Sequence, residues 1–457
     1  MKQMPVWVLV GLSLIIPLAT QAKVTEFTLD NGLKLIVNED HRAPVVVSQV
    51  WYKVGSSYEK NGITGVSHVL EHMMFKGTET LKPGEFSRII SANGGRENAF
   101  TSRDYTAYFQ RLEKSRLPVS FKLEADRMRG LKLDDKEFQK EVNVVMEERR
   151  LRTEDKPEAF TYEKFNAVAQ LTSPYRTPII GWMKDLQSMT VADLDQWYRR
   201  WYAPNNATVV VAGDVDPKEV LALAKKYFGP LKPSENLLPP KPQTETEQTG
   251  PRSIQVKLPA KLPYLIMGYP VPTLNVAEKE WEVYALEVLA GILDGGDSAR
   301  LPARLVNQKG LLTSAGAGYS LNSRLSGLFL LDAVPAQGYT VKQAEQALRK
   351  EIQALHEKPV TQAELDRIKA QVVASNVYER DSIFYQAMQI GVYETVGLGW
   401  KRIDDYVNKI QAVTAEQVQS VAKKYLIEDK LTLAELIPLP MEKSQPSSQS
   451  VGVKHGH

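Results

Sequence analysis

The 457-residue sequence contains no cysteine. Disulfide bonds are therefore excluded, and a tightly bound transition metal would have to be held by histidine and carboxylate side chains. Cross-links are not needed at this length, because a chain of this size can bury two or more hydrophobic cores.

An excess of charge of one sign is also lacking. Lys and Arg number 57 and Asp and Glu 54, which gives a formal net charge of +3. No basic stretch is interleaved with aromatic residues, so the sequence predicts no nucleic-acid partner. The hydrophobic fraction of 43% and the charged fraction of 24% are those of ordinary globular domains.

Long apolar stretches are scarce as well. The one candidate, residues 6–19, follows Lys2 and is shorter than the roughly 20 residues that span a bilayer. Small residues at Thr20 and Ala22 then fit a signal-peptidase site. We therefore predict a signal peptide over residues 1–22, with an uncleaved N-terminal anchor as the alternative. The mature protein is expected to be periplasmic or secreted, with no membrane attachment.

Histidine is rare, yet two of the six histidines stand at the spacing of metal ligands. His68 and His72 are four residues apart, which places them on one face of a helix, and Glu71 borders that face. Two imidazoles suit zinc, and a nearby carboxylate suits removing a proton from a metal-held water molecule. This His-x-x-Glu-His order reverses the commoner zinc-protease motif. Taken alone, the pattern also fits two ordinary surface or core histidines.

The surroundings of the motif favour the metal interpretation. Apolar residues give the helix a broad hydrophobic surface, so it is predicted to be buried; they are Val66, Val69, Leu70, Met73 and Met74. Buried histidine and glutamate side chains are costly unless they have partners, and a shared metal ion would supply one.

A third ligand is expected from residues 136–152, which are strong helix formers. Glu141 and Glu148 are two turns apart, on a face that we predict also carries Val144 and Val145. A carboxylate on an apolar face is unusual unless it is paired or ligated.

Glu148 is therefore the predicted third metal ligand, with Glu141 as a supporting carboxylate or auxiliary acid. The adjacent Glu147 is expected on the solvated face with Lys140 and Arg150. A charged surface helix without any ligand is the alternative interpretation.

The second half of the chain repeats the first. Thr190 precedes a predicted helix and a strand that begins at Ala207, and Thr414 precedes a similar helix and a strand that begins at Leu431. The repeat predicts an α+β fold of two homologous domains, each with an antiparallel-rich sheet packed against helices. Because residues 285–293 of the second copy form an apolar helix without the histidine motif, only the first copy can hold the metal.

Composition sets the expected domain boundaries. Residues 231–252 are rich in Pro, Glu, Gln and Thr and are predicted to be an exposed linker. The first domain then covers residues 23–230 and the second residues 253–440. Residues 441–457 are Ser- and Gln-rich and are predicted to be a disordered tail.

Taken together, these segments resemble the pitrilysin and insulinase family of zinc peptidases, in the two-domain branch that includes the mitochondrial processing peptidase. The resemblance covers about residues 24–437. It rests on Asn31-Gly32-Leu33, the whole stretch Gly65 to Thr78, Gly94-Gly95, Asn98-Ala99, Thr101, the spacing from His72 to Glu148, and Tyr202-Pro204-Asn206.

The resemblance implies a metalloendopeptidase that forms half of a clamshell and holds one Zn²⁺ per chain. His68, His72 and Glu148 would bind the zinc, and Glu71 would be the general base. Asn98 and Ala99 would lie on an edge strand that pairs with the backbone of extended or unfolded peptide substrates.

One departure from the family pattern concerns substrate binding. An arginine and a tyrosine that contact substrate in the family's second domain align here with Val306 and Thr313. Our hypothesis is that a sister chain supplies both groups in a heterodimer, with a homodimer also possible. Arg304 and Tyr319 are candidate substitutes within this chain. A non-catalytic interaction subunit of the same fold is the alternative function, although the intact set of four polar site residues argues against it.

Overall fold

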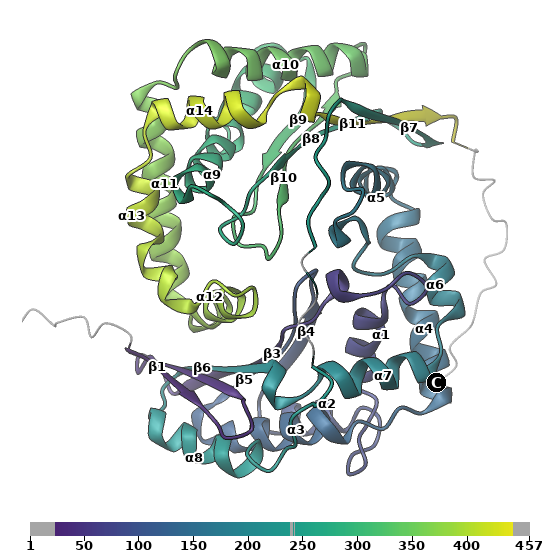
Figure 1. Cartoon of the computed structure of the whole chain (residues 1–457), viewed down its shortest axis with the longest axis vertical. Coiled ribbons are helices and arrows are strands. Elements are labelled where there is room, and N and C mark those ends of the chain that lie inside the picture. Colours follow the sequence, from purple (N-terminus) through teal and green to yellow (C-terminus); the bar gives the residue numbers. More distant parts are fainter. Residues whose placement is uncertain (1–22, 238–240, 242, 442–457) are drawn as a thin grey trace, which may run out of the picture.

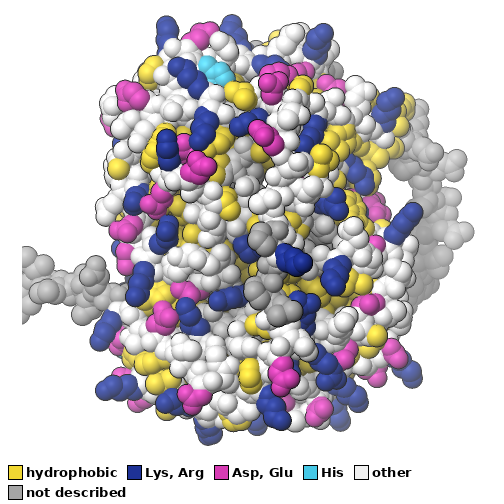
Figure 2. Space-filling view, viewed as in Figure 1, with side chains coloured by type: hydrophobic (Ala, Val, Ile, Leu, Met, Phe, Trp, Pro, Cys, Tyr) yellow, Lys and Arg dark blue, Asp and Glu magenta, His cyan; other side chains and the backbone are white. Residues whose placement is uncertain are grey.

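The computed structural model describes residues 23–237, 241 and 243–441. The predicted signal peptide and nearly all of the predicted tail lie outside these residues. No described helix is both long and apolar enough to cross a bilayer. Charged side chains of both signs are interspersed over the face shown in Figure 2, in keeping with the near-neutral composition.

The first domain is built on a six-stranded sheet in the order β1-β2-β6-β3-β5-β4 (Figure 1). Its strands are β1 (Lys23–Thr28), β2 (Lys34–Glu39), β3 (Val45–Tyr52), β4 (Arg96–Thr101), β5 (Thr106–Glu113) and β6 (Ala207–Gly213). Only the β2–β6 pair is parallel. Strand β4 pairs with β5 alone among the described strands, so it forms an edge of the sheet.

The second sheet repeats this topology, and the described residues include no counterpart of β1 in it. Its order is β7-β11-β8-β10-β9, and its strands are β7 (Arg252–Pro259), β8 (Tyr264–Val271), β9 (Leu312–Gly318), β10 (Gly327–Pro335) and β11 (Thr432–Leu439). The pair β7–β11 is parallel, as β2–β6 is in the first sheet. The equivalent order confirms the predicted duplication and the α+β fold class.

Helices cover one face of each sheet. In the first domain they are α1 (Val66–Met73), α2 (Glu85–Ala92), α3 (Leu117–Gly130), α4 (Asp135–Arg149), α6 (Met183–Ser188), α7 (Val191–Trp201) and α8 (Pro217–Tyr227). In the second they are α9 (Glu280–Asp294), α10 (Val341–Glu357), α11 (Gln362–Asp381), α13 (Tyr406–Gln411) and α14 (Ala415–Tyr425). The repeated helices α7 and α14 both begin with a capping box, at Thr190 and Thr414 respectively.

The two domains exchange a helix across their interface. Helix α5 (Pro157–Ala169) comes from the first half of the chain but packs on the second sheet, and α12 (Ile383–Thr395) comes from the second half but packs on the first sheet (Figure 1). Gly391 of α12 lies so close to Trp51 that an added Cβ would come within 2.0 Å of the indole. The exchange places α5 between the sheets.

The predicted linker is less exposed than its composition indicates. Its described residues form no helix or strand before Arg252, which begins β7. The carboxylate of Glu245 accepts hydrogen bonds from backbone N–H groups of residues 171–173, and Gln248 is buried. Most of the described linker residues are exposed or half-buried, and these two side chains tie the segment to backbone groups of the first domain and, through the Leu431 carbonyl, of the second.

Candidate metal centre

Helix α1 carries the histidine motif, and its start is determined by two features. Gly65 has φ +88°, and a Cβ there would lie 2.6 Å from the carbonyl oxygen of Ile180, so the position favours glycine. The carboxylate of Glu59 accepts hydrogen bonds from the backbone N–H groups of Gly65 and Ser67, at 2.7 and 2.8 Å. It thereby satisfies two of the donors that a helix leaves free at its first turn.

The two imidazole rings face the same space beside α1. Their centroids are 5.0 Å apart. Nε2 of His68 lies 3.7 Å, and Nε2 of His72 3.6 Å, from Oε2 of Glu148. One ligand atom from each of these three residues lies within 4.8 Å of the other two, which is the geometry of a shared metal ion.

Glu148 reaches this point from α4. Its other oxygen, Oε1, lies 2.5 Å from Arg152, which leaves Oε2 directed toward the two histidines. The neighbouring Glu147 is exposed and pairs with Arg150, as expected from the sequence. Val145 is buried, but the prediction that Val144 shares its face is wrong, since Val144 is 47% exposed.

The helix itself also differs from its predicted extent of residues 136–152. The α-helical turns end at Arg149, and the chain continues as a π-helical turn over Arg150–Glu154. The wider turn carries Arg152 beside Glu148.

Glu141 stands behind the ligands. Its Oε2 lies 3.2 Å from Nδ1 of His72, and its Oε1 pairs with Lys76 at 2.8 Å. A carboxylate at Nδ1 favours the tautomer in which Nδ1 carries the proton and Nε2 keeps its lone pair. The contact therefore suits the role of a supporting carboxylate rather than that of a ligand.

The protonation of His68 also suits metal binding. Burial lowers the pKa of His68 to about 3, with smaller contributions from the nearby His72 and Arg152, so its imidazole is neutral at pH 7. Its Nδ1 is buried without a hydrogen-bond partner among the described residues. Two imidazole nitrogens and one carboxylate oxygen form a donor set that fits Zn²⁺.

Glu71 does not belong to this donor set but opens into the same cavity. Burial raises its pKa, and a hydrogen bond from the Thr101 hydroxyl at 2.5 Å acts in the opposite direction. Thr101 is the last residue of β4, so the edge strand and the motif helix meet at this hydrogen bond.

The cavity beside these residues measures about 860 Å³. Asn98 and Ala99 of the edge strand β4 line it; these are the two residues that the family resemblance implies for substrate binding. Helix α5 lines another side, and Tyr264 of β8 is the one lining residue that the described part of the second domain contributes. The site therefore lies between the two domains.

The two positions that depart from the family pattern lie elsewhere. None of Val306, Thr313, Arg304 and Tyr319 is among the described residues that line the cavity. Arg304 pairs with Glu351 at 2.7 Å, and the Tyr319 hydroxyl donates to the carbonyl oxygen of Pro272. The two suggested substitutes are thus already engaged within the second domain.

Sequence reasoning missed several contacts of the site. Arg152 follows Glu148 by four residues, so helical spacing was an available signal for that pair, whereas Lys76 lies beyond the end of α1 and reaches Glu141 on α4. No local signal pointed to Glu59 or Thr101, because each acts across a turn or between a strand and a helix.

Comparison with known proteins agrees with the fold and places the chain in a peptidase family. The family description "Insulinase (Peptidase family M16)" matches residues 34–181, and "Peptidase M16 inactive domain" matches residues 188–372. The zinc protease PqqE of Helicobacter pylori is 35% identical over 418 residues, which cover 90% of this chain and 92% of that protein. The chain belongs to the insulinase family of peptidases, M16.

Solved structures extend the comparison. A protease from Helicobacter pylori is 32% identical, with a TM-score of 0.86, and the match covers 92% of this chain and all of that one. The periplasmic protease PqqL from Escherichia coli shares the fold at 20% identity and a TM-score of 0.77. That match covers 91% of this chain but 47% of PqqL, so the present chain corresponds in fold to about half of that protein.

Proposed function

We propose that this chain is a zinc-dependent endopeptidase that hydrolyses extended peptides or unfolded polypeptide segments. The observation that carries the proposal is the convergence of His68, His72 and Glu148 beside Glu71, in a cavity that an edge strand also lines. The family and the zinc-protease names of its relatives support the same reaction class.

Each site residue has a role in this proposal. His68, His72 and Glu148 hold one Zn²⁺, and Glu141 orients His72. The bound zinc would supply Lewis-acid activation of water and of the scissile carbonyl. Glu71 accepts the proton from the attacking water and delivers it to the leaving amine, as a general base and then a general acid.

The edge strand β4 is the proposed peptide-binding element. Oδ1 of Asn98 accepts a hydrogen bond from the backbone N–H of Ala99 at 2.9 Å. A substrate carbonyl could replace that side-chain oxygen and extend the sheet by one strand. Recognition through backbone groups suits substrates of varied sequence.

A sister subunit is the proposed source of the missing substrate contacts. Val306 and Thr313 offer no charged or aromatic hydroxyl group, and this chain corresponds to about half of PqqL. A heterodimer with a paralogous chain would complete the enclosure, with a homodimer as the second possibility. The periplasmic relative and the predicted signal peptide support a periplasmic location.

The test of the proposed function is Glu71→Gln in the mature chain. We expect this variant to bind zinc like the wild type, because Glu71 is not a ligand, and to lose peptide cleavage. Zinc is measured by elemental analysis and cleavage with a quenched fluorescent peptide, in each case with and without a co-expressed paralogue. Cleavage by Glu71→Gln at the wild-type rate would refute the assignment.

A non-catalytic subunit is the second candidate function. It is favoured by the description of the second domain as inactive and by Val306 and Thr313. In that case neither the wild type nor Glu71→Gln would cleave peptide in any subunit combination, and Glu71→Gln would leave complex formation unchanged.

A further inference from the structure

A loop of the second domain reaches into the first domain behind the cavity. Arg324 lies in this loop, between β9 and β10. Its backbone N–H donates to Oδ2 of Asp104 at 3.0 Å, and its Nε donates to Oδ1 at 3.3 Å. Its guanidinium also donates to Ser57 and lies 4.4 Å from the ring centroid of Tyr58. A single side chain of the second domain is thus held by the first domain and, through a hydrogen bond to Gln243 at 3.1 Å, by the linker.

Asp104 is the centre of this contact. It is buried, with 4% of its surface exposed, and it lies in the turn that joins β4 to β5. It also accepts hydrogen bonds from the hydroxyl groups of Ser57, at 2.8 Å, and Tyr175. A buried carboxylate without a cation would be costly, and Arg324 supplies the positive charge beside Asp104 while the two hydroxyl groups add hydrogen bonds.

The same turn holds the end of the proposed peptide-binding strand. Thr101 is the last residue of β4, three positions before Asp104, and its hydroxyl donates to Glu71. The backbone between them is fixed by hydrogen bonds from Ser56 to Ser102 and from Ser57 to Arg103. Movement of the turn would therefore move the hydroxyl that orients Glu71.

We infer that Arg324 is a positioning residue for the site of the first domain. By fixing Asp104, it holds the β4–β5 turn and, through Thr101, the carboxylate of Glu71. The second domain then contributes to the reaction without touching substrate. This inference rests on the proposed peptidase function.

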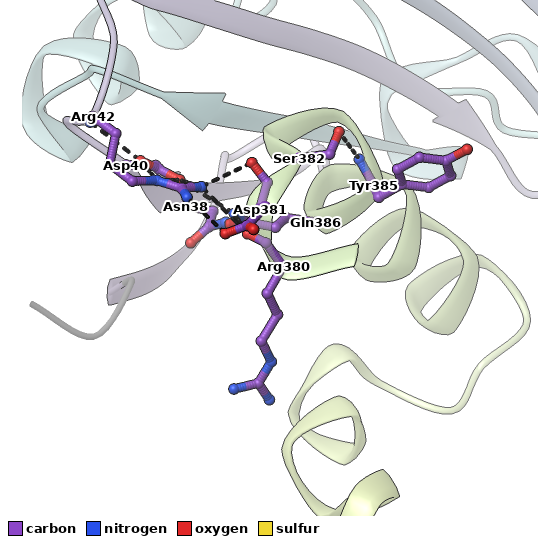
Figure 3. Close-up of polar contacts among 8 residues, drawn as sticks. All are labelled: Asn38, Asp40, Arg42, Arg380, Asp381, Ser382, Tyr385 and Gln386. Atoms are coloured by element: carbon purple, nitrogen blue, oxygen red, sulfur yellow. Dashed lines mark hydrogen bonds and ion pairs between the residues drawn. The ribbon is translucent and has the colours of Figure 1, made fainter. Parts of the chain in front are cut away.

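The competing explanation is that Arg324 only holds the two domains together. The chain offers a matched control for it, because Arg42 makes a second polar contact between the domains (Figure 3). Arg42 pairs with Asp40 at 2.7 Å and with Asp381 at 3.2 Å, and it donates to the carbonyl oxygen of Arg380. None of these residues is among the described residues that line the metal-site cavity.

The experiment compares Arg324→Gln, Arg324→Lys and Arg42→Gln in the full chain, with its sister chain present if activity requires it. We expect Arg324→Gln to lower kcat roughly 10- to 100-fold at unchanged zinc content, since small displacements of a reacting group are costly in rate. Arg324→Lys keeps a cation beside Asp104 and should recover part of the loss. Arg42→Gln should stay within about twofold of wild type, as expected for substitution at a contact away from the reacting groups. Equal losses in Arg324→Gln and Arg42→Gln would overturn the inference.

A double-mutant cycle with Thr101→Val tests the route of the effect. If Arg324 acts through Thr101, the double variant should lose little more activity than Thr101→Val alone. Independent structural damage would instead make the two losses multiply, and that result would overturn the inference.

Amide hydrogen exchange tests whether Arg324 holds the β4–β5 turn without requiring an activity assay. Arg324→Gln should speed exchange of the amides of residues 102–105, and Arg42→Gln should not. Unchanged exchange in Arg324→Gln would overturn the inference by itself. If the wild-type chain cleaved no peptide in any combination, the proposed function would fail, while the exchange comparison would still decide whether Arg324 holds the turn.

Discussion

Nδ1 of His72 lies 3.2 Å from Oε2 of Glu141, so a metal-facing imidazole is oriented from behind by a carboxylate on a different helix. Substitution of such supporting groups typically lowers metal affinity by about 10- to 100-fold. We therefore expect Glu141→Gln to bind zinc about 10- to 100-fold more weakly than wild type while keeping the fold. Competition with a fluorescent chelator measures the affinity.

The control for this prediction is Glu147→Gln on the same helix. Glu147 is exposed and pairs with Arg150, so its loss removes the same charge without touching His72. Its zinc affinity should match that of wild type. An equal weakening in both variants would mean that general charge, rather than the contact with His72, supports the metal.

The local part of the site could be predicted from the sequence. Apolar residues at 66, 69, 70 and 73 place His68 and His72 on a buried helix, and α1 buries these positions. The two-turn spacing of Glu141 and Glu148 likewise predicts that both carboxylates share one face of α4, and in the structure both lie beside the histidines. Helical geometry is local, so the sequence of each helix is enough to group the side chains on one of its faces, whereas the approach of α4 to α1 depends on tertiary packing.

Val144 shows where such a reading fails. Its neighbour Val145 is buried while Val144 is exposed, because successive residues point about 100° apart around a helix and only one of them faces the core. The sequence of α4 alone does not determine which side of the helix faces the core.

The remaining contacts depend on how distant segments pack. Thr101 meets Glu71 only because β4 lies against α1, and Arg324 meets Asp104 only because the domains dock. The exchange of α5 and α12 is of the same kind. An apolar helix face shows that something covers it but does not show which sheet does.

The helix exchange makes a prediction about stability. In Gly391→Ala, the added Cβ would lie about 2 Å from the indole of Trp51, which is fully buried beneath α12. We expect a loss of roughly 1–3 kcal/mol in the free energy of unfolding, the usual cost of overpacking. Urea denaturation followed by tryptophan fluorescence measures it. Gly250→Ala is the control, because no atom lies within 4 Å of a Cβ there, and its unfolding curve should match that of wild type.

A second stability prediction concerns the ion pair under the first sheet. Arg127 and Glu124 are both fully buried and pair at 2.5 Å, and the guanidinium also lies 4.4 Å from the ring centroid of Tyr108. Glu124→Gln would leave the buried guanidinium of Arg127 without its carboxylate. Breaking a buried ion pair in this way lowers the free energy of unfolding by roughly 3–5 kcal/mol. We expect a clearly lower melting temperature, measured by calorimetry. The exposed pair of Glu137 with Lys140 provides the control, and Glu137→Gln should have the same melting temperature as the wild type.

The last prediction concerns how stability depends on pH through Glu287 of α9, the helix of the second domain that corresponds to α1. Burial raises the pKa of Glu287 on α9 to about 7. Between pH 4.5 and 7 the folded protein therefore binds more protons at this residue than the unfolded chain does. Its contribution to stability is fully present below about pH 4.5 and is lost as the pH rises through 7.

Glu287→Gln removes this titration. The free energy of unfolding of wild type minus that of the variant should therefore fall steadily from pH 4.5 to 7 and then level off. Urea denaturation at a series of pH values measures the difference, in which the contributions of the other titrating groups cancel. A difference that stays constant across this range would show that the Glu287 carboxyl is solvated, despite its place among apolar residues of α9 and beside Tyr319 and Tyr406.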